Sequence, residues 1–264
     1  MSKKTNTLLQ VFKMCESRGE FVFNNDEVKK VCQKTGFKNP FDLTHLDNTD
    51  KIPTELKQKD YFPIRLGKGR YQFIKGIKHA YHNFEPITDI RSWKYRKNIL
   101  DGINSSEANI LSVISNQRII HDFLYEDIRE NPNVYGAHRT KHTFHYHVGG
   151  NRMNCEKLQV EIDATLENAG RITVIESKNN MRKNFAIYQL YNPFRRYYDL
   201  YQNKKIIIKN PRYQFEIECC YIVKVENKKT GITSVSCYLY VFEDPQNMSS
   251  IKLKKTRKYN LIPH

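Results

Sequence analysis

Long apolar runs are missing from this sequence, and so is an apolar stretch near its N-terminus. A helix that crosses a bilayer needs about 20 consecutive apolar residues, and no segment approaches that length. The first residues, Met-Ser-Lys-Lys-Thr-Asn-Thr, are polar and lack the charged, apolar and small-residue order of a secretion signal. We therefore expect no membrane partner and a cytoplasmic location.

Cysteines are few, and none is spaced as Cys-x-x-Cys. The six stand at positions 15, 32, 155, 219, 220 and 237. Several fall on apolar faces, which predicts buried free thiols in a reducing compartment. We expect neither structural zinc on these cysteines nor a small-molecule cofactor.

Acidic residues are scarce beside basic ones. The chain has 44 Lys and Arg against 28 Asp and Glu, a formal net charge of +16. Such an excess favours a polyanionic partner, because a charge of this size otherwise repels itself. A lysine-biased composition without a polyanionic partner is the alternative, and composition alone does not separate the two.

The first 75 residues predict three helices and a hairpin. Residues 5–17 carry apolar side chains at helical spacing, and residues 24–36 begin with Asn and Asp caps and close at Gly36. Asn39-Pro40 predicts the start of a third helix, with Phe41, Leu43 and Leu46 buried. Residues 61–74 form a hairpin around Gly67-Lys68-Gly69.

This order resembles a winged-helix domain, which we place at residues 1–78. The resemblance implies that the third helix enters a groove of DNA while the hairpin touches the backbone. It would put Thr44 and His45 on the exposed face of that helix, with Lys68 and Arg70 on the wing. A small α+β packing module that binds no DNA is the alternative.

The middle of the chain predicts a connector and a long helix. Residues 79–104 hold Pro86 and a basic-aromatic stretch around Trp93, which could touch phosphate or anchor the core. Ser105-Ser106 cap an amphipathic helix that runs to about Phe123.

From residue 156 onward the pattern predicts strands. Residues 157–165 and 171–178 form a pair of strands joined by the turn 168–170. Residues 181–201 are expected to be helical in two pieces, broken before Pro193. Further strands are expected at 204–209, 214–226 and 232–243. The basic tail, 252–258, is expected to be mobile.

Three charged side chains converge on this strand pair. Alternate residues of a strand share one face, so Glu176 and Lys178 project together, and Asp163 joins them if the strands pair in register. The same alternation adds Glu161. Burying such charges is costly unless they serve a purpose. Two carboxylates on a rigid sheet can hold Mg²⁺, and a nearby lysine can help a metal-activated water to attack a phosphodiester.

At these residues the sequence resembles the PD-(D/E)xK nuclease superfamily, and type II restriction endonucleases in particular. Asp163 matches the first acidic position and Glu176-Ser-Lys178 matches (D/E)xK, while Ile162 stands where the motif's name has proline. The resemblance covers about residues 105–245. It implies Mg²⁺-dependent cleavage of double-stranded DNA, with Asp163 and Glu176 as metal ligands and Lys178 as the assistant of the water.

Further side chains could support the site. The family often has an acidic residue on a preceding helix, where Glu107 stands, and a helix after the motif, which makes Gln189 a candidate. Glu161 could be a second metal ligand or an outer acid.

A second cluster combines four histidines with basic residues. His138, His142, His145 and His147 could bind zinc, although no cysteine or acid completes a familiar spacing. A DNA-facing strand is the other interpretation, with Thr143, His145 and His147 on one face beside Arg139 and Lys141. A third interpretation is that these histidines are simply exposed and have no role.

Two arginines follow the motif. Arg195-Arg196 could contact the DNA backbone, or they could belong to a solvated helix face.

The sequence thus predicts an α+β protein in which a winged-helix-like domain (1–78) and a connector (79–104) precede a nuclease core with a mixed sheet (105–264). The expected function is that of a type II restriction endonuclease, as a homodimer acting on double-stranded DNA. The alternatives are a repair, recombination or mobile-element nuclease, and a non-catalytic winged-helix regulator.

Overall fold

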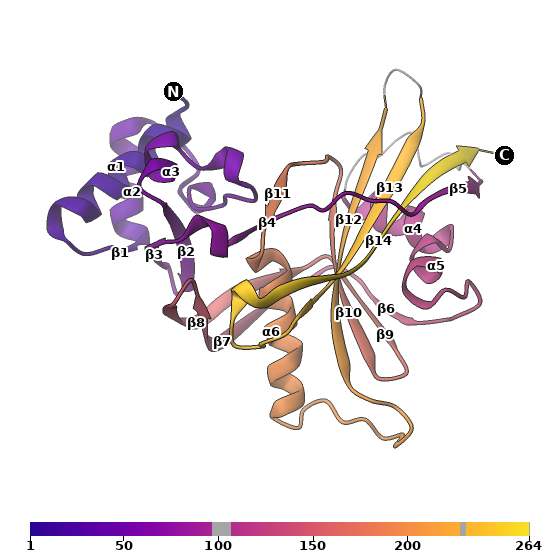
Figure 1. The fold of residues 1–264 in the computed structure, drawn as a ribbon. Helices are drawn as coiled ribbons and strands as arrows, with labels where there is room; N and C mark the ends of the chain where they lie inside the picture. Colours follow the sequence, from indigo (N-terminus) through magenta and orange to yellow (C-terminus); the bar gives the residue numbers. More distant parts are fainter. Residues whose placement is uncertain (97–106, 228–230, 264) are drawn as a thin grey trace.

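The computed structural model describes residues 1–96, 107–227 and 231–263. A smaller helical lobe at the N-terminus lies beside a larger lobe built on a twisted sheet (Figure 1). Within the described residues, no helix combines the length and apolar character needed to cross a membrane.

The N-terminal lobe follows its local sequence signals closely. Its helices are α1 (Lys3–Arg18), α2 (Asn25–Thr35) and α3 (Thr54–Gln58), and its strands β1 (Val22–Asn24), β2 (Tyr61–Gly67) and β3 (Arg70–Lys75) form a sheet in the order β1-β3-β2. Asn24 and Glu27 make a reciprocal capping box at α2, and Gly36 ends that helix in the left-handed conformation. The hairpin and the first two helices are as the sequence predicts.

The third helix expected from Asn39-Pro40 is wrong. Only a 3₁₀ turn (Pro40–Asp42) forms there, Phe41 is 63% exposed, and α3 begins fourteen residues later. Two backbone carbonyl groups of this segment accept hydrogen bonds from distant side chains. Arg65 donates to Phe41 O, and the hydroxyl of Tyr81 donates to Leu46 O. Leu43 and Leu46 are nevertheless buried, as the sequence predicts, although the helix expected to bury them does not form.

A seven-stranded mixed sheet forms the larger lobe. Its order is β5-β14-β13-β12-β10-β9-β6. The strands are β5 (Ile90–Tyr95), β14 (Ile251–Pro263), β13 (Thr233–Phe242), β12 (Glu216–Glu226), β10 (Arg171–Lys178), β9 (Ala164–Asn168) and β6 (Asn133–Tyr135). The pairs β10–β12 and β14–β5 are parallel and the others antiparallel.

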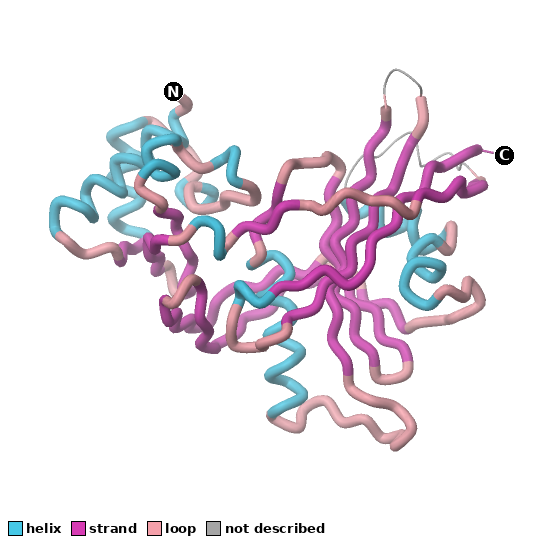
Figure 2. The backbone as a smooth tube through the Cα atoms, viewed as in Figure 1, coloured by secondary structure: helices cyan, strands magenta, loops and turns pink. Residues whose placement is uncertain are grey.

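Helices cover both faces of this sheet (Figure 2). On one face, α4 (Glu107–Asn116) and α5 (Ile119–Tyr125) pack against Ile175 and Ile222. On the other, α6 (Tyr188–Gln202) packs against Val174 and Tyr221. Because neighbouring residues of β10 and β12 face opposite layers, both strands are buried along most of their length.

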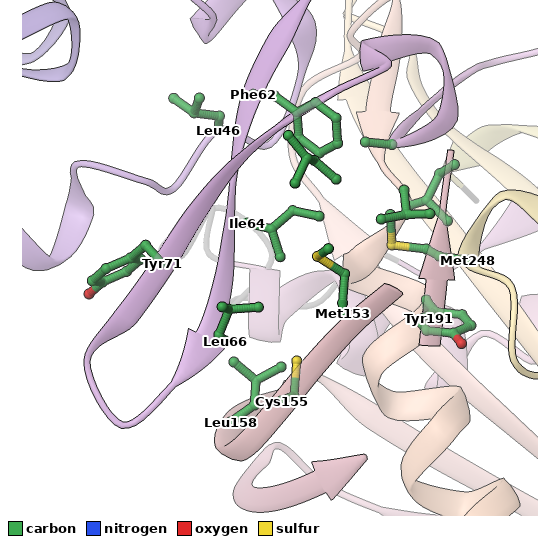
Figure 3. Close-up of a cluster of buried hydrophobic side chains, with 14 of the residues drawn as sticks. Leu46, Phe62, Ile64, Leu66, Tyr71, Met153, Cys155, Leu158, Tyr191 and Met248 are labelled. Carbon is green, nitrogen blue, oxygen red and sulfur yellow. The ribbon is translucent and has the colours of Figure 1, made fainter. Parts of the chain in front are cut away.

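A separate two-stranded ribbon links the lobes. Its strands are β7 (His138–Val148) and β8 (Asn151–Ile162), and one face of the ribbon is buried. Figure 3 shows Ile64 and Leu66 of the N-terminal hairpin packed with Met153, Cys155 and Leu158 of β8, and these side chains belong to one continuous core. Gly67 has φ +83°, and a Cβ there would lie 2.1 Å from Glu156 O, so only glycine permits this approach.

Three expectations for the larger lobe are wrong. Residues 77–96 are more than a connector, because they contain β4 (Tyr81–Asn83) and β5, and β5 pairs with β14 in the main sheet. Residues 184–186 form β11 (Asn184–Ala186), paired with β4, in place of a helix. Residues 204–209 form no strand.

Two more corrections concern the C-terminal half. The helix α6 continues through Pro193, because buried Tyr191 and Phe194 anchor it on both sides of that residue. The expected mobile tail is the long strand β14, in which Arg257, Tyr259 and Leu261 point inward while its four lysines are at least partly exposed. The many lysines of this segment made its alternation of buried and exposed residues hard to recognise in the sequence.

Candidate active site

Asp163 and Glu176 lie next to each other because two strands pair as a hairpin. Asp163 occupies the bend between β8 and β9, and β9 pairs antiparallel with β10 so that Ala164 faces Ile175. Oδ2 of Asp163 accepts hydrogen bonds from the backbone N–H of Ser177 at 2.9 Å and from its hydroxyl at 3.1 Å. The bend therefore fixes this carboxylate against the strand that carries Glu176.

Lys178 and Gln189 both hold Glu176. Oε1 of Glu176 lies 2.7 Å from Nζ of Lys178 and accepts a hydrogen bond from Nε2 of Gln189 at 2.8 Å. Nζ of Lys178 also donates to the carbonyl oxygen of Ser177 at 3.1 Å. Glu176 is 8% exposed, so these bonds act away from bulk water, where electrostatic interactions are stronger.

The three charged residues line a cleft between the lobes. The cleft has a volume of about 200 Å³ and reaches from the end of β8 to the N-terminal hairpin. Its lining includes Phe62 and Arg65 from β2, Gln159 and Glu161 from β8, and side chains from the start of α6. A molecule in this cleft would therefore contact both lobes and the carboxylates together.

A divalent cation suits the chemistry of these donors. Asp163 and Glu176 offer hard carboxylate oxygens, and Lys178 supplies one positive charge against their two negative ones. The hydrogen bonds that fix Asp163 both end on Oδ2, and no described residue bonds Oδ1. In the described part of the chain, no three His, Cys, Asp or Glu side chains converge. An ion here would keep several water ligands, as Mg²⁺ does in proteins.

The expected supporting residues differ in their placement. Gln189 bonds Glu176 directly, as described above. Glu161 lines the cleft, but its side chain is 55% exposed and pairs with Arg139 at 3.0 Å, whereas Glu176 is buried. Glu107 is the first residue of α4, and its side chain lies outside the described residues.

Thr44 and His45 do not form an outward recognition surface. Thr44 is 5% exposed and accepts a hydrogen bond from Nε of Arg65, and both residues line the cleft. His45 lies with Nε2 2.6 Å from Oδ1 of Asp47. Burial raises the pKa of Asp47, but hydrogen bonds from His45 and Lys51 outweigh it, so the net pKa is lowered. The expectation of an exposed helix face here is wrong, because the helix itself does not form.

The wing residues point toward β8. Lys68 forms an ion pair with Glu156, and Nη2 of Arg70 lies 3.9 Å from the same carboxylate. These side chains are about half exposed, so they border the ribbon rather than projecting away from the molecule.

The ribbon divides the four histidines. His145 and His147 are exposed on the same face as Arg139 and Lys141, in the alternation that the sequence predicts. His142 faces the other way, is buried, and lies with Nε2 2.7 Å from Oδ2 of Asp199 on α6. The exposed His138 completes the set, and the four do not converge on one point.

Arg195 is a buried structural residue. It is 5% exposed, pairs with Asp199 at 2.9 Å and donates to Pro245 O at 2.7 Å. Its expected contact with DNA is therefore wrong. Arg196, the next residue, is partly exposed.

Sequence reasoning missed several residues of the cleft and ribbon. Arg65, Tyr188 and Asn192 line the cleft, and Arg152 lies opposite His147 on the exposed face of the ribbon. Only the period of two in residues 151–162 could have revealed Arg152. The others face the cleft because distant elements pack together, which no local pattern encodes.

Comparison with known families matches nearly the whole chain. A family model described as a domain of unknown function (DUF6996) matches residues 4–73, and one described as a domain of unknown function (DUF6997) matches residues 76–260. Nothing among curated proteins or among solved structures matches the chain. The two matched regions meet at the end of β3. Since the second covers well over half of its length, the chain belongs to the family described as domain of unknown function DUF6997.

Proposed function

We propose that this protein is a Mg²⁺-dependent endonuclease that hydrolyses phosphodiester bonds of double-stranded DNA, in the manner of a type II restriction endonuclease of the PD-(D/E)xK superfamily. One observation carries the proposal: Asp163, Glu176 and Lys178 converge at a cleft that both lobes line. Two carboxylates and an ammonium group at an accessible cleft are suited to phosphodiester hydrolysis.

Each residue has a separate task in this reaction. Asp163 and Glu176 would hold the ion, which when bound polarises the phosphate and lowers the pKa of a water ligand. Lys178 donates protons in hydrogen bonds, and its position beside Glu176 lets it orient the attacking water or stabilise negative charge on the phosphate. Ser177 and Gln189 fix the two carboxylates, so that little reorganisation is needed during the reaction.

DNA as the substrate is supported by the exposed face of the ribbon. Arg139, Lys141, His145 and His147 project from β7, with Arg152 across from His147. A two-stranded ribbon fits the major groove of B-DNA. The same face continues into the cleft through Gln159 and Glu161, so a duplex bound here would bring its backbone close to Asp163. The net charge of +16 agrees with a polyanionic partner.

The N-terminal lobe has the element order of a winged-helix domain. Two helices flank β1, and α3 precedes the β2–β3 hairpin. We propose that this lobe closes one side of the DNA-binding cleft through Arg65, which donates to Thr44 and to Phe41 O at the cleft wall. We further propose that a homodimer positions two such sites on the two strands of one duplex.

Digestion of a long, defined duplex with Mg²⁺, followed by sequencing of the ends, tests this function. The wild type is expected to give discrete, reproducible fragments, and Asp163→Asn is expected to bind the same DNA without cutting it. Asparagine keeps an oxygen that can accept from Ser177, so this variant separates metal binding from folding. Cleavage by Asp163→Asn at the wild-type rate would refute the assignment. A smear or structure-dependent nicking would favour a repair or mobile-element nuclease.

A further inference from the structure

The cleft beside Glu176 is large enough to hold an aromatic ring. Its volume of about 200 Å³ exceeds that of an engineered protein cavity of about 150 Å³ that binds benzene. Phe62, Tyr81, Tyr146 and Tyr188 supply aromatic lining, and Thr44, Gln189 and Asn192 add polar groups. This combination of flat apolar surface and a few polar atoms is typical of a site for a small planar ligand.

Two oxygen atoms of this lining are buried without a hydrogen-bond partner. Nε2 of Gln189 donates to Glu176, which leaves Oε1 as the other end of the amide, and no described residue bonds that oxygen. Oδ1 of Asn192, one turn further along α6, is likewise buried and without a partner in the described part of the chain. Gln189 as a whole is 9% exposed. Orphaned buried acceptors are rare because each costs free energy, so a pair lining one cleft points to a ligand that donates.

We propose that the cleft binds a nucleobase with an exocyclic amino group, and that this amino group donates to Oε1 of Gln189 and Oδ1 of Asn192. The inference rests on the proposed function, which puts a nucleic acid phosphate at Asp163 and Glu176, and it adds a base-specific subsite to it. Adenine, cytosine and guanine carry such a group, whereas thymine, uracil and hypoxanthine do not. The rings of the lining tyrosines provide stacking surface for the base.

The tyrosines of the cleft suit a neutral heterocycle. Burial raises the pKa of Tyr188 well above its ordinary value, so the phenol stays protonated. The hydroxyl of Tyr81 donates to Leu46 O at 3.0 Å, which fixes that ring at the wall. Neither residue therefore brings a negative charge against the base.

Two sources can deliver this base. A nucleotide next to the cleaved phosphate can rotate out of the duplex into the cleft, at the cost of unstacking, or a free nucleotide can enter it. Gln159 lies on the exposed face of the ribbon and also lines the cleft, which favours the first source. Both present the same amino group to the same two oxygens.

Matched nucleotides test the subsite directly. Asp163→Asn protein is titrated with dAMP against dIMP and with dCMP against dUMP, which differ at the amino position. We expect the amino forms to bind about tenfold more tightly, because the deaminated forms leave the acceptors unpaired. Asn192→Leu in the same background is expected to lose most of this discrimination. The control Gln202→Leu, at the exposed end of α6, is expected to keep it.

Equal binding of the amino and deaminated nucleotides, or no binding of either, would overturn the proposal even if Asn192→Leu does not fold.

Chemical footprinting of a duplex bound to Asp163→Asn protein then separates the two sources of the base. If a base becomes reactive to permanganate or chloroacetaldehyde because it has lost its base-pairing partner, the result supports extrusion. If the whole duplex stays protected, the subsite is assigned to free nucleotides. Digestion by the wild type reports on the proposed function independently, because failure to cut DNA leaves the nucleotide preference measurable.

Discussion

Two clusters of charge lie on opposite faces of the main sheet, and they differ in what surrounds them. On the α5 face, the carboxylate of Asp122 lies 3.1 Å from Arg91 and 3.0 Å from Arg257, and it accepts a hydrogen bond from the hydroxyl of Tyr259 at 2.6 Å. On the α6 face, the carboxylate of Glu176 lies 2.7 Å from the ammonium group of Lys178, and Glu176, Lys178 and Asp163 line a cleft.

Burial and charge alone do not distinguish these clusters. The side chain of Asp122 is 14% exposed and that of Glu176 is 11% exposed. The difference is that cations and a hydroxyl surround Asp122, whereas Glu176 opens onto a volume that a ligand can enter. A buried carboxylate surrounded by cations indicates a structural role, and carboxylates that line a cleft indicate a chemical one.

The largest expected effect comes from Glu176→Gln. Removing one carboxylate weakens metal binding and transition-state stabilisation by several kcal/mol, so we expect cleavage to fall about a thousandfold. Glutamine can still accept from Gln189, so the thermal unfolding midpoint should remain close to that of the wild type. Single-turnover cleavage with saturating Mg²⁺ measures the effect. Cleavage by this variant at the wild-type rate would show that Glu176 has no chemical role.

Asp122→Asn should show the opposite behaviour. It leaves the buried guanidinium of Arg257 with less compensating charge, and we expect a loss of about 3 kcal/mol in unfolding free energy. Urea denaturation measures this loss, while cleavage per folded molecule should be unchanged. A folded Asp122→Asn protein that no longer cuts DNA would show that the two clusters are not separate in role.

The ribbon gives a smaller effect through the salt dependence of binding. Lys141 is exposed, and its replacement by alanine removes one phosphate contact, so the slope of log K against log salt should decrease in magnitude by about 0.9. The control Lys209→Ala, in the irregular segment after α6, should leave the slope unchanged. Equal slopes for wild type and Lys141→Ala would place the DNA away from this face.

His121 gives the smallest effect, and it belongs to the structural face. Burial lowers its pKa, and the nearby Arg118, which donates to Nε2 at 2.9 Å, lowers it further. A lowered pKa in the folded state means that the stabilisation is present above the unfolded pKa of about 6.5 and is lost as pH falls through the folded value. Unfolding free energy should therefore decline less between pH 7 and 5 in His121→Gln than in the wild type. An identical decline in both proteins would contradict this role.

Features set by neighbouring residues were predictable from the sequence. The caps at Asn24 and Gly36 define α2, and the turn at residues 168–170 pairs β9 with β10, which brings Asp163 beside Glu176. Both depend on contacts within a few residues of the chain.

Features set by distant contacts were not predictable. In the segment after Asn39, side chains of Arg65 and Tyr81 donate to backbone carbonyl groups, and Arg195 is buried where it donates to Pro245 O, 50 residues away. The strand β14 pairs with β5 and β13, and its lysines resemble those of a solvated tail. In each case a tertiary partner overrides the local pattern.

The position of β14 has a consequence for how the protein is made. This strand is inserted between β5 and β13, and its partner β5 emerges from the ribosome long before it. Until β14 arrives, β5 has no partner in the main sheet and one edge of β13 is open, which are conditions that favour intermolecular strand pairing. Closing so distant a parallel pair is also slow. We therefore expect the nascent chain to depend on chaperones from the time β5 emerges until the lysine-rich β14 completes the sheet.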